Sequence, residues 1–359
     1  MRSMQEVRVN YWTKIRLWAR TGLYTVFSMS VLLGVATQLY AAEPYELKFP
    51  LGLKKELAVI PDDNPMTKEK VELGKLLFFD TRLSKNDSIA CASCHIPSLA
   101  FTDGQAVSTG IHRQQGGRSA PTAINRVFSS GQFWDGRAVT LEEQSVGPLT
   151  NPVEHGFANH EEVVAKLKSI DGYKRMFQHA FGSGISAHTI GQAIASFQRT
   201  LLSGNSPFDQ HDSGSNSKAL SAGAQNGLTL FRGKALCFTC HSGSNFTDEK
   251  FHNLGVDWDR DHADLGRYIV TKSPKDVGAF KTPTLREISQ TAPYMHDGRF
   301  STLRQVVDFY DRGGIDNPRK DPLIQPLKLT EPEKEDLVEF LRSLSGEGWR
   351  VNPPTQFPK

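Results

Sequence analysis

The chain has 359 residues, 38% of them hydrophobic, with glycines and prolines scattered along it, a composition that excludes a largely disordered protein. It is long enough for a sizeable core, most simply in two domains. Residues 1–42 carry a charge of +4 within a formal total of +3, so the remainder carries −1 and nothing favours nucleic acid as a partner.

The first segment is predicted to direct export. Residues 21–42 contain no charged side chain, and the positive charges of this region all precede them. Cleavage after Ala41 or Ala42 would put Leu39 or Tyr40 where a small residue is preferred. We therefore expect residues 1–42 to be either a signal peptide or an uncleaved N-terminal membrane anchor.

All four cysteines lie in two copies of one motif. The copies are CASCH (Cys91, Cys94, His95) and CFTCH (Cys237, Cys240, His241). C-x-x-C-H attaches a c-type haem, because two thioethers hold the porphyrin edge and the next histidine offers its imidazole to the iron. A redox pair or a four-cysteine zinc site would not explain why both copies end in histidine. The sequence therefore predicts two covalently bound haems c.

The residues around the two motifs also repeat. GKLLF and GLTLF precede the cysteines, and APT and TPT follow them. WDGRAVTL then begins at Trp134, and HDGRFSTL begins at His296. In both halves the aspartate of this last segment stands 14 residues after the proline of the preceding one, so one module has been used twice.

Each module is predicted to be a small helical haem domain, because long alternating strand patterns are absent. The expected fold class is mainly α, with two cytochrome-c-like haem domains in tandem. Residues 43–205 would form the N-terminal domain and residues 206–359 the C-terminal domain. The stretch 201–223, polar and rich in serine and glycine, is expected to be the linker.

The helix predicted in TLRQVVDFY places Tyr310 on its apolar, inward face. Tyr310 stands 13 residues after Asp297, and the residue 13 after Asp135 is Pro148. Proline has no side-chain atom that can bind iron. If Tyr310 is the far-side ligand of the second haem, the first haem has no ligand at the corresponding position, as an enzyme requires.

These motifs resemble those of the bacterial di-haem cytochrome c peroxidase family, in particular its MauG-like branch. The resemblance runs from about Val71 to the C-terminus and includes VELGKLLFFDTRLS, RSAPTAIN, QFWDGRA, GRYIVT, FKTPTLR and TAPYMHDG, together with both haem motifs. It implies a periplasmic oxidoreductase whose N-terminal domain binds peroxide at its haem and whose C-terminal domain carries an electron-transfer haem.

The resemblance also assigns roles by position. Glu154 and Gln144 match the peroxide-pocket residues of the family, and Trp134 matches its tryptophan between the haems. Pro148 matches a pocket proline of the MauG-like branch. Tyr310 stands where typical peroxidases have the axial methionine and the MauG-like branch has tyrosine. The iron ligands expected are His95, His241 and Tyr310.

Two places depart from the family pattern. Ile111, not His112, aligns with the histidine that blocks the first iron in typical peroxidases before reduction, and His112 stays an alternative ligand of that iron. The family also holds calcium between its domains. Groups matching Ser119, Thr291 and Pro293 would bind it here, although the serine hydroxyl is a weaker ligand than the usual asparagine carbonyl.

Three functions are compatible with these residues. The leading hypothesis is reduction of hydrogen peroxide with electrons from a small periplasmic cytochrome c or copper protein, through a high-valent first haem coupled by Trp134 to a His/Tyr-ligated second haem. The second is MauG-like oxidation of a partner protein by long-range electron transfer. The third is a non-catalytic di-haem electron carrier, for instance with His112 and Met295 as iron ligands.

Overall fold

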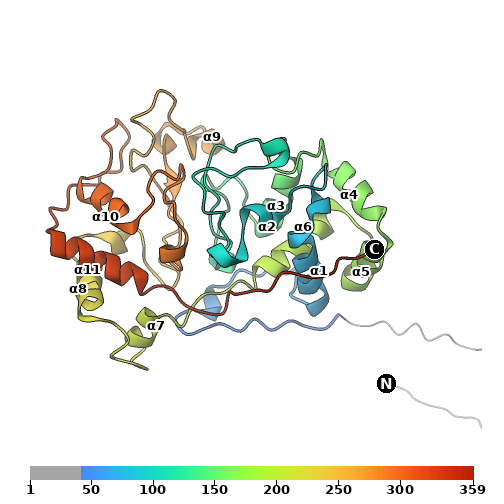
Figure 1. Cartoon of the computed structure of the whole chain (residues 1–359), viewed down its shortest axis with the longest axis horizontal. Coiled ribbons are helices and arrows are strands. Elements are labelled where there is room, and N and C mark those ends of the chain that lie inside the picture. The colour runs from blue at the N-terminus through green and yellow to red at the C-terminus, as the bar shows by residue number, and fades with distance from the viewer. Residues whose placement is uncertain (1–41) are drawn as a thin grey trace, which may run out of the picture. The chain divides into compact units, whose positions relative to one another are not determined.

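Helices and loops make up nearly all of the structure, a computed structural model that describes residues 42–359 (Figure 1). The α-helices are α1 (Lys68–Phe79), α2 (Cys91–Cys94), α3 (Leu141–Val146), α4 (His160–Lys168), α5 (Asp171–Phe181), α6 (Ala187–Gln198), α7 (Pro207–Asp212), α8 (Ala222–Arg232), α9 (Tyr268–Thr271), α10 (Leu303–Asp311) and α11 (Glu331–Arg342). Short 3-10 helices lie at Lys55–Leu57, Thr81–Leu83, Pro97–Leu99, Ile111–Arg113, Arg126–Phe128, Gly147–Thr150, Cys237–Thr239, Pro274–Asp276 and Ile288–Gln290.

The described chain has a single small sheet, in which β1 (Phe251–His252) pairs antiparallel with β2 (Phe280–Lys281). The prediction of a mainly α fold is therefore confirmed. The predicted leader lies outside the described residues except for its last residue, Ala42. Within residues 42–359 no helix combines the length and the apolar character needed to cross a bilayer.

Each half is built around a close crossing of two helices. In the first half α1 packs against α6, and in the second half α8 packs against α11. A Cβ atom on Gly74 would lie 1.8 Å from the carbonyl oxygen of Ala193, and one on Gly227 would lie 2.0 Å from that of Asp336. These glycines are the first residues of GKLLF and GLTLF, so the sequence repeat preserves the same helix crossing.

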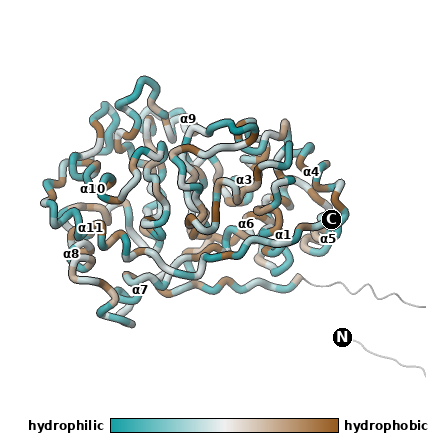
Figure 2. The backbone as a smooth tube through the Cα atoms, viewed as in Figure 1, coloured by the Kyte–Doolittle hydropathy of each residue, from teal (hydrophilic) through white to brown (hydrophobic). Residues whose placement is uncertain are grey.

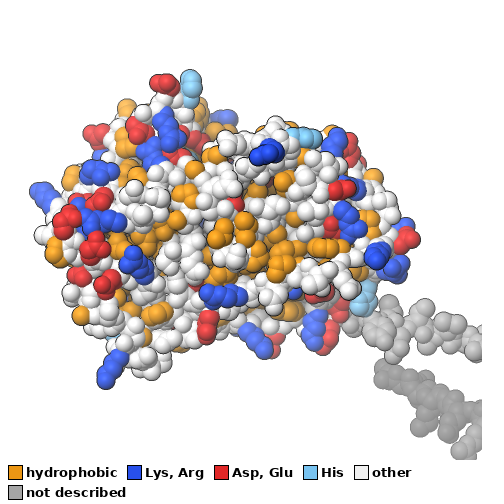
Figure 3. All heavy atoms as spheres, in the orientation of Figure 1, with side chains coloured by type: hydrophobic (Ala, Val, Ile, Leu, Met, Phe, Trp, Pro, Cys, Tyr) orange, Lys and Arg blue, Asp and Glu red, His pale blue; other side chains and the backbone are white. Residues whose placement is uncertain are grey.

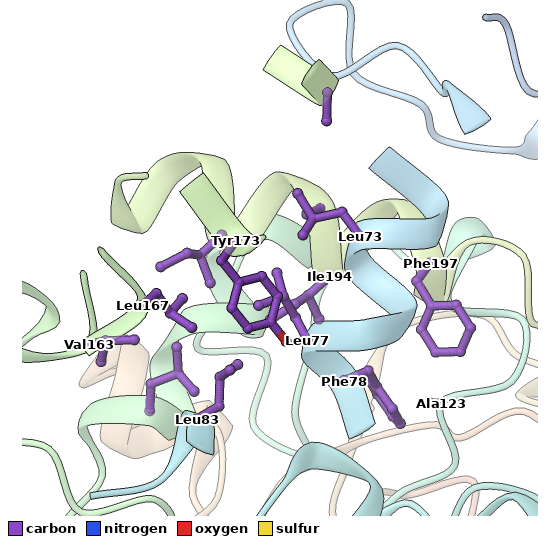
Figure 4. Packing of buried hydrophobic residues seen from close by; sticks show 14 of the residues in the cluster. Leu73, Leu77, Phe78, Leu83, Ala123, Val163, Leu167, Tyr173, Ile194 and Phe197 are labelled. Atoms are coloured by element: carbon purple, nitrogen blue, oxygen red, sulfur yellow. The ribbon is translucent and has the colours of Figure 1, made fainter. Parts of the chain in front are cut away.

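The larger apolar core belongs to the first half. Leu73 and Leu77 of α1 point toward Tyr173 of α5 and Ile194 of α6, with Phe78 and Phe197 at the edge of the cluster (Figure 4). A second core in the other half includes Phe231 of α8 and Phe340 of α11. Apolar stretches lie mainly on helices and inner segments, and polar stretches mark the outer loops and α10 (Figure 2).

The polar stretch 201–223 runs between the two cores but is not a flexible linker. It contains α7, whose Asp209 forms a fully buried ion pair with Arg286, with Oδ2 and Nη1 2.5 Å apart. Ser203 Oγ donates a hydrogen bond to Glu287 Oε1 over 2.5 Å. Polar composition led to the prediction of an interdomain linker here, and the serine and aspartate side chains of this stretch have buried partners in the second half.

The last residues of the chain return to the first half. Trp349 is fully buried in the first core and meets Phe101 edge-on, with ring centroids 6.3 Å apart. The amide of Gly172 in α5 donates to the carbonyl of Lys359 over 2.6 Å. Figure 1 shows the C-terminus beside α5. The domain boundary between residues 205 and 206 stays a prediction. The C-terminal tail follows this boundary in the sequence but contributes to the core of the first half.

Charged side chains crowd the outer face of α10 and α11 (Figure 3). Lys334 lies 2.9 Å from Asp308 and 3.0 Å from Asp311, and Arg304 pairs with Asp308 at 3.3 Å. Most of these groups are partly exposed, so each pair contributes little to the free energy of unfolding. The network keeps this end of the second half polar.

Gly74→Ala tests the close helix crossing. The added methyl group collides with the backbone of α6, so the free energy of unfolding should fall by about 1–3 kcal/mol, the usual cost of overpacking. Gly184→Ala is the control, because a Cβ atom on Gly184 meets nothing within 4 Å. Thermal unfolding followed by circular dichroism should show a lower midpoint for Gly74→Ala only. Equal midpoints would contradict the crossing.

Candidate haem and peroxide site

The first haem motif lies on α2 and the residue that follows it. The Nδ1–H group of His95 donates to the carbonyl of Phe101 over 2.9 Å, which leaves Nε2 as the ring atom free to bind iron. Burial lowers the pKa of His95 and favours the neutral imidazole, the form that coordinates a metal.

The second motif is held in the same way. Cys237–Thr239 form a short 3-10 helix, and the Nδ1–H group of His241 donates to the carbonyl of Phe246 over 3.1 Å. Burial again lowers the pKa of the imidazole. The two halves therefore hold His95 and His241 in equivalent ways, each with Nε2 free for an iron ion, and their role as iron ligands stays a prediction.

One cavity of about 780 Å³ joins the two motifs. Its walls contain nearly all the predicted site residues: Cys94, His95, Ser119, Trp134, Gln144, Pro148, Glu154, Cys237, Cys240, His241, Thr291, Pro293 and Tyr310. Cys91 lies on α2 behind this wall. The space between the motifs is thus large and is lined by the groups that covalent haems require.

Two cations on the cavity wall fit the anionic propionate groups of a haem. Lys281 is 5% exposed, and its Nζ lies 3.4 Å from Glu249 Oε2. Burial, followed by the positive charge of Arg126, lowers the pKa of Lys281 to about 8. Arg126 forms no ion pair with any residue in the range 42–359 and instead donates to Gln132 Oε1 over 2.8 and 2.9 Å. The excess positive charge favours binding of carboxylates.

Helix α10 brings Tyr310 into the cavity beside the second motif. The helix begins after Thr302, whose Oγ1 accepts from the amide of Gln305 over 3.2 Å. The Tyr310 hydroxyl has no hydrogen-bond partner among the described residues. Burial, and then the nearby Cys237 and Cys240 thiols, raise the pKa of Tyr310. An iron ion would supply the positive charge that favours the phenolate.

The first half ends its corresponding helix early. α3 and α10 both follow a capping threonine, Thr140 in one case and Thr302 in the other. α3 stops at Val146, and the chain continues as the 3-10 helix Gly147–Thr150. This helix brings Pro148 to the cavity wall. The Gly-Pro sequence thus replaces the turn that would otherwise carry a ligand.

Glu154 and Gln144 are the polar groups that face this part of the cavity. Asn151 Nδ2 donates to Glu154 Oε1 over 2.6 Å. Burial raises the pKa of Glu154, and the positive charge of Arg137 and the Asn151 hydrogen bond partly offset the rise. Gln198 Nε2 donates to Gln144 Oε1 over 3.3 Å, so the Gln144 amide nitrogen stays free to donate.

The two repeats meet at Trp134 and His296. Trp134 Nε1 donates to the carbonyl of Ser119 over 2.9 Å, and the Ser119 amide donates to the carbonyl of His296 over 2.7 Å. The two rings lie edge to face with centroids 6.5 Å apart, and His296 stacks on Phe280 at 3.6 Å. Burial lowers the pKa of His296 to about 4. No role for His296 was predicted from the sequence, although aligning HDGR with WDGR pairs it with Trp134.

Comparisons with known proteins identify the family of this chain. A family model described as di-haem cytochrome c peroxidase matches residues 68–217. The methylamine utilization protein MauG of Methylorubrum extorquens is 42% identical over 300 residues, which cover 82% of this chain and 83% of that protein. This chain belongs to the di-haem cytochrome c peroxidase family.

Other members of the family are similar over most of the chain. The cytochrome-c peroxidase IdrP1 of a Pseudomonas species is 38% identical over 317 residues, which cover 80% of this chain and 83% of that protein. A crystal structure of a MauG-like protein associated with microbial copper homeostasis is 35% identical, with a TM-score of 0.78, and covers 86% of this chain and 98% of that one. The predictions of an oxidoreductase and of two c-type haems are confirmed at the level of this di-haem peroxidase family.

The residues proposed as calcium ligands or as alternative iron ligands differ in whether they line the cavity. Ser119, Thr291 and Pro293 all line the cavity, and calcium binding there stays a prediction. His112 is exposed and does not line the cavity, whereas Met295 does. Sequence reasoning did not find Asn151, Arg126 or Lys281, because neither spacing nor residue type distinguishes them from surface polar groups.

Tyr310→Phe tests the assignment of the second iron ligand. Removal of the hydroxyl should abolish the low-spin ferric signal of the second haem in electron paramagnetic resonance, because phenylalanine cannot ligate iron. Tyr294→Phe is the control, since the Tyr294 hydroxyl already donates to the carbonyl of Ile288. An unchanged signal in Tyr310→Phe, with a loss in Met295→Leu instead, would assign the ligand to Met295.

Proposed function

We propose that this protein reduces hydrogen peroxide to water at its first haem site, with electrons delivered through the second. The observation that carries the proposal is the combination of Pro148 and Glu154 on the cavity wall of the first half. Pro148 offers the iron no ligand, and Glu154 offers a carboxyl group with a raised pKa for proton transfer. An electron carrier would need neither feature.

The first haem would supply the iron that holds one peroxide oxygen and that takes up the oxidising equivalents. Glu154, as the carboxylate, would accept a proton from one oxygen of the peroxide and deliver it to the other, which leaves as water. The free amide N–H of Gln144 donates toward the peroxide and orients it. Over the whole cycle one peroxide, two protons and two electrons give two molecules of water.

Electrons would travel between the two halves at the contact of Trp134 with His296. These two rings lie edge to face with centroids 6.5 Å apart and bring the WDGR segment of one half into contact with the HDGR segment of the other. A small periplasmic cytochrome c or copper protein would supply the electrons to the second haem. The proposal includes export of the protein to the periplasm, where c-type haems are attached, with residues 1–42 as its signal or anchor.

MauG-like oxidation of a partner protein is the second candidate, and Tyr310 is the observation that favours it. An anionic oxygen ligand stabilises an oxidised iron better than a thioether sulfur does. Peroxide consumption driven by reduced cytochrome c supports the peroxidase. A peroxide-oxidised state that persists in the presence of the reduced cytochrome supports oxidation of a protein instead.

Glu154→Gln tests the proton-transfer role. The amide cannot accept the proton, so cleavage of the peroxide O–O bond should slow by about 100-fold or more. Stopped-flow absorbance of the oxidised protein mixed with peroxide measures this rate. Glu161→Gln, which changes an exposed residue of α4, is the control. An unchanged rate in Glu154→Gln excludes the proposed role.

Asn151→Ala tests the tuning of Glu154. Loss of the hydrogen bond removes a contribution that lowers the pKa of Glu154, so this pKa should rise. The reaction needs the carboxylate, so the acid limb of the pH–rate profile should move to higher pH. Arg137→Gln should move it in the same direction, because Arg137 is the charged group that lowers this pKa. A limb that stays in place in both variants contradicts the assignment.

A further inference from the structure

A second cavity, of about 240 Å³, lies beside the haem cavity. Five residues line both spaces, namely Phe133, Arg137, Pro148, Asn151 and Glu154. The two cavities therefore meet at the Glu154 carboxyl group and its hydrogen-bond partner. The second space reaches the proton-transfer group without passing through the region of the second haem motif.

Exposure changes along the second cavity. Arg137, Glu143 and Gly147 are exposed, whereas Asn151 and Glu154 are half-buried. Glu143 and Gly147, which are exposed and do not line the haem cavity, mark the solvent end, and the half-buried Asn151 and Glu154 mark the end that joins the haem cavity. This order describes a passage from solvent to the peroxide pocket.

The width of this passage is set by the stacked Phe133 and Arg137 side chains on one side and by Gly147 on the other. The guanidinium group of Arg137 lies over the ring of Phe133 at 3.6 Å, and its Nη1 pairs with Asp135 Oδ1 at 3.1 Å. These contacts hold both side chains flat. Gly147 lies opposite, because a Cβ atom added to it would first meet Phe133 Cζ, at 3.8 Å. Any longer side chain at position 147 would extend into the space in front of the Phe133 ring.

The charges at the solvent end offset one another. Arg137 is positive and Glu143 is negative, and the Glu143 side chain is held by the amide of Val139, which donates to Oε2 over 2.8 Å. A mouth with balanced charges gives no electrostatic preference for anions or cations. It suits a small neutral molecule such as hydrogen peroxide.

We propose that peroxide reaches Glu154 through this second cavity, and that Gly147 and the Phe133–Arg137 pair limit the passage to small neutral molecules. The inference rests on the proposed function and adds a route and a size limit to it. It makes Gly147 a residue that determines specificity by the absence of a side chain. Arg137 has a second role as one wall of the passage.

Gly147→Leu is the direct test, with cyanide as the probe. The backbone of Gly147 has φ −55° and ψ −50°, in the α region, which the following Pro148 disfavours for a residue with a Cβ atom, so Gly147→Ala reports the effect of backbone strain without the bulk of leucine. Association of cyanide with the oxidised full-length protein is followed by absorbance near neutral pH, where hydrogen cyanide is uncharged. The association rate should fall about tenfold or more, and Gly147→Ala should give a smaller decrease.

Two further variants complete the experiment. Gly184→Leu, in an exposed loop with nothing within 4 Å of a Cβ atom, should leave the rate unchanged. Arg137→Ala removes one wall, so it should raise the rate and let imidazole bind faster. Unchanged cyanide rates in both Gly147→Leu and Arg137→Ala overturn the proposed route.

Failure of the proposed function gives different results. Absence of cyanide binding to the unaltered protein would show that the first iron has no open position. Normal cyanide binding together with an undiminished peroxide reaction in Glu154→Gln would reject the catalytic role while the passage stands. Reduction potentials of both haems, measured in each variant, confirm that the haem sites are intact.

Discussion

Ser119 joins the two repeats, and the arrangement of the site depends on this junction. Its carbonyl accepts from Trp134, and its amide donates to His296, so the WDGR loop of one half and the HDGR loop of the other are fixed against each other. Buried backbone groups of a loop need such partners, and here the amide and the carbonyl of Ser119 are each satisfied by one of the two loops. As a result, the two haem motifs open into one cavity rather than two.

The two halves share this arrangement, but α3 of the first half is one helical turn shorter than α10 of the second. Both begin the relevant helix after a capping threonine, but α10 continues to Asp311, whereas α3 ends at Val146. The longer helix carries Tyr310 to the second motif, and the shorter one leaves Pro148 beside Glu154. The proposed division between an electron-transfer site and a peroxide site would thus follow from a Gly-Pro pair that ends α3 early.

Sequence patterns predicted the parts of this arrangement that depend on covalent or periodic constraints. C-x-x-C-H predicts both haem attachment sites. The repeated spacing aligns Trp134 with His296 and Pro148 with Tyr310 in the two copies of the module. Side chains that act through tertiary contacts could not be predicted in this way. Asn151 is significant only because its amide points at Glu154, and Lys281 only because Arg126 lies near it. The stretch 201–223 shows the same limit, since serine and aspartate suggest a loop until their buried partners are known.

The return of the tail to the first half has a consequence for the order of folding. Synthesis begins at the N-terminus, so α1 and α6 can form long before Trp349 and Lys359 are added to the chain. The N-terminal core lacks one of its largest buried side chains until synthesis is complete. The first half therefore reaches its final packing last, and a fragment cut before Trp349 would leave the first core incomplete even though both haem motifs are intact.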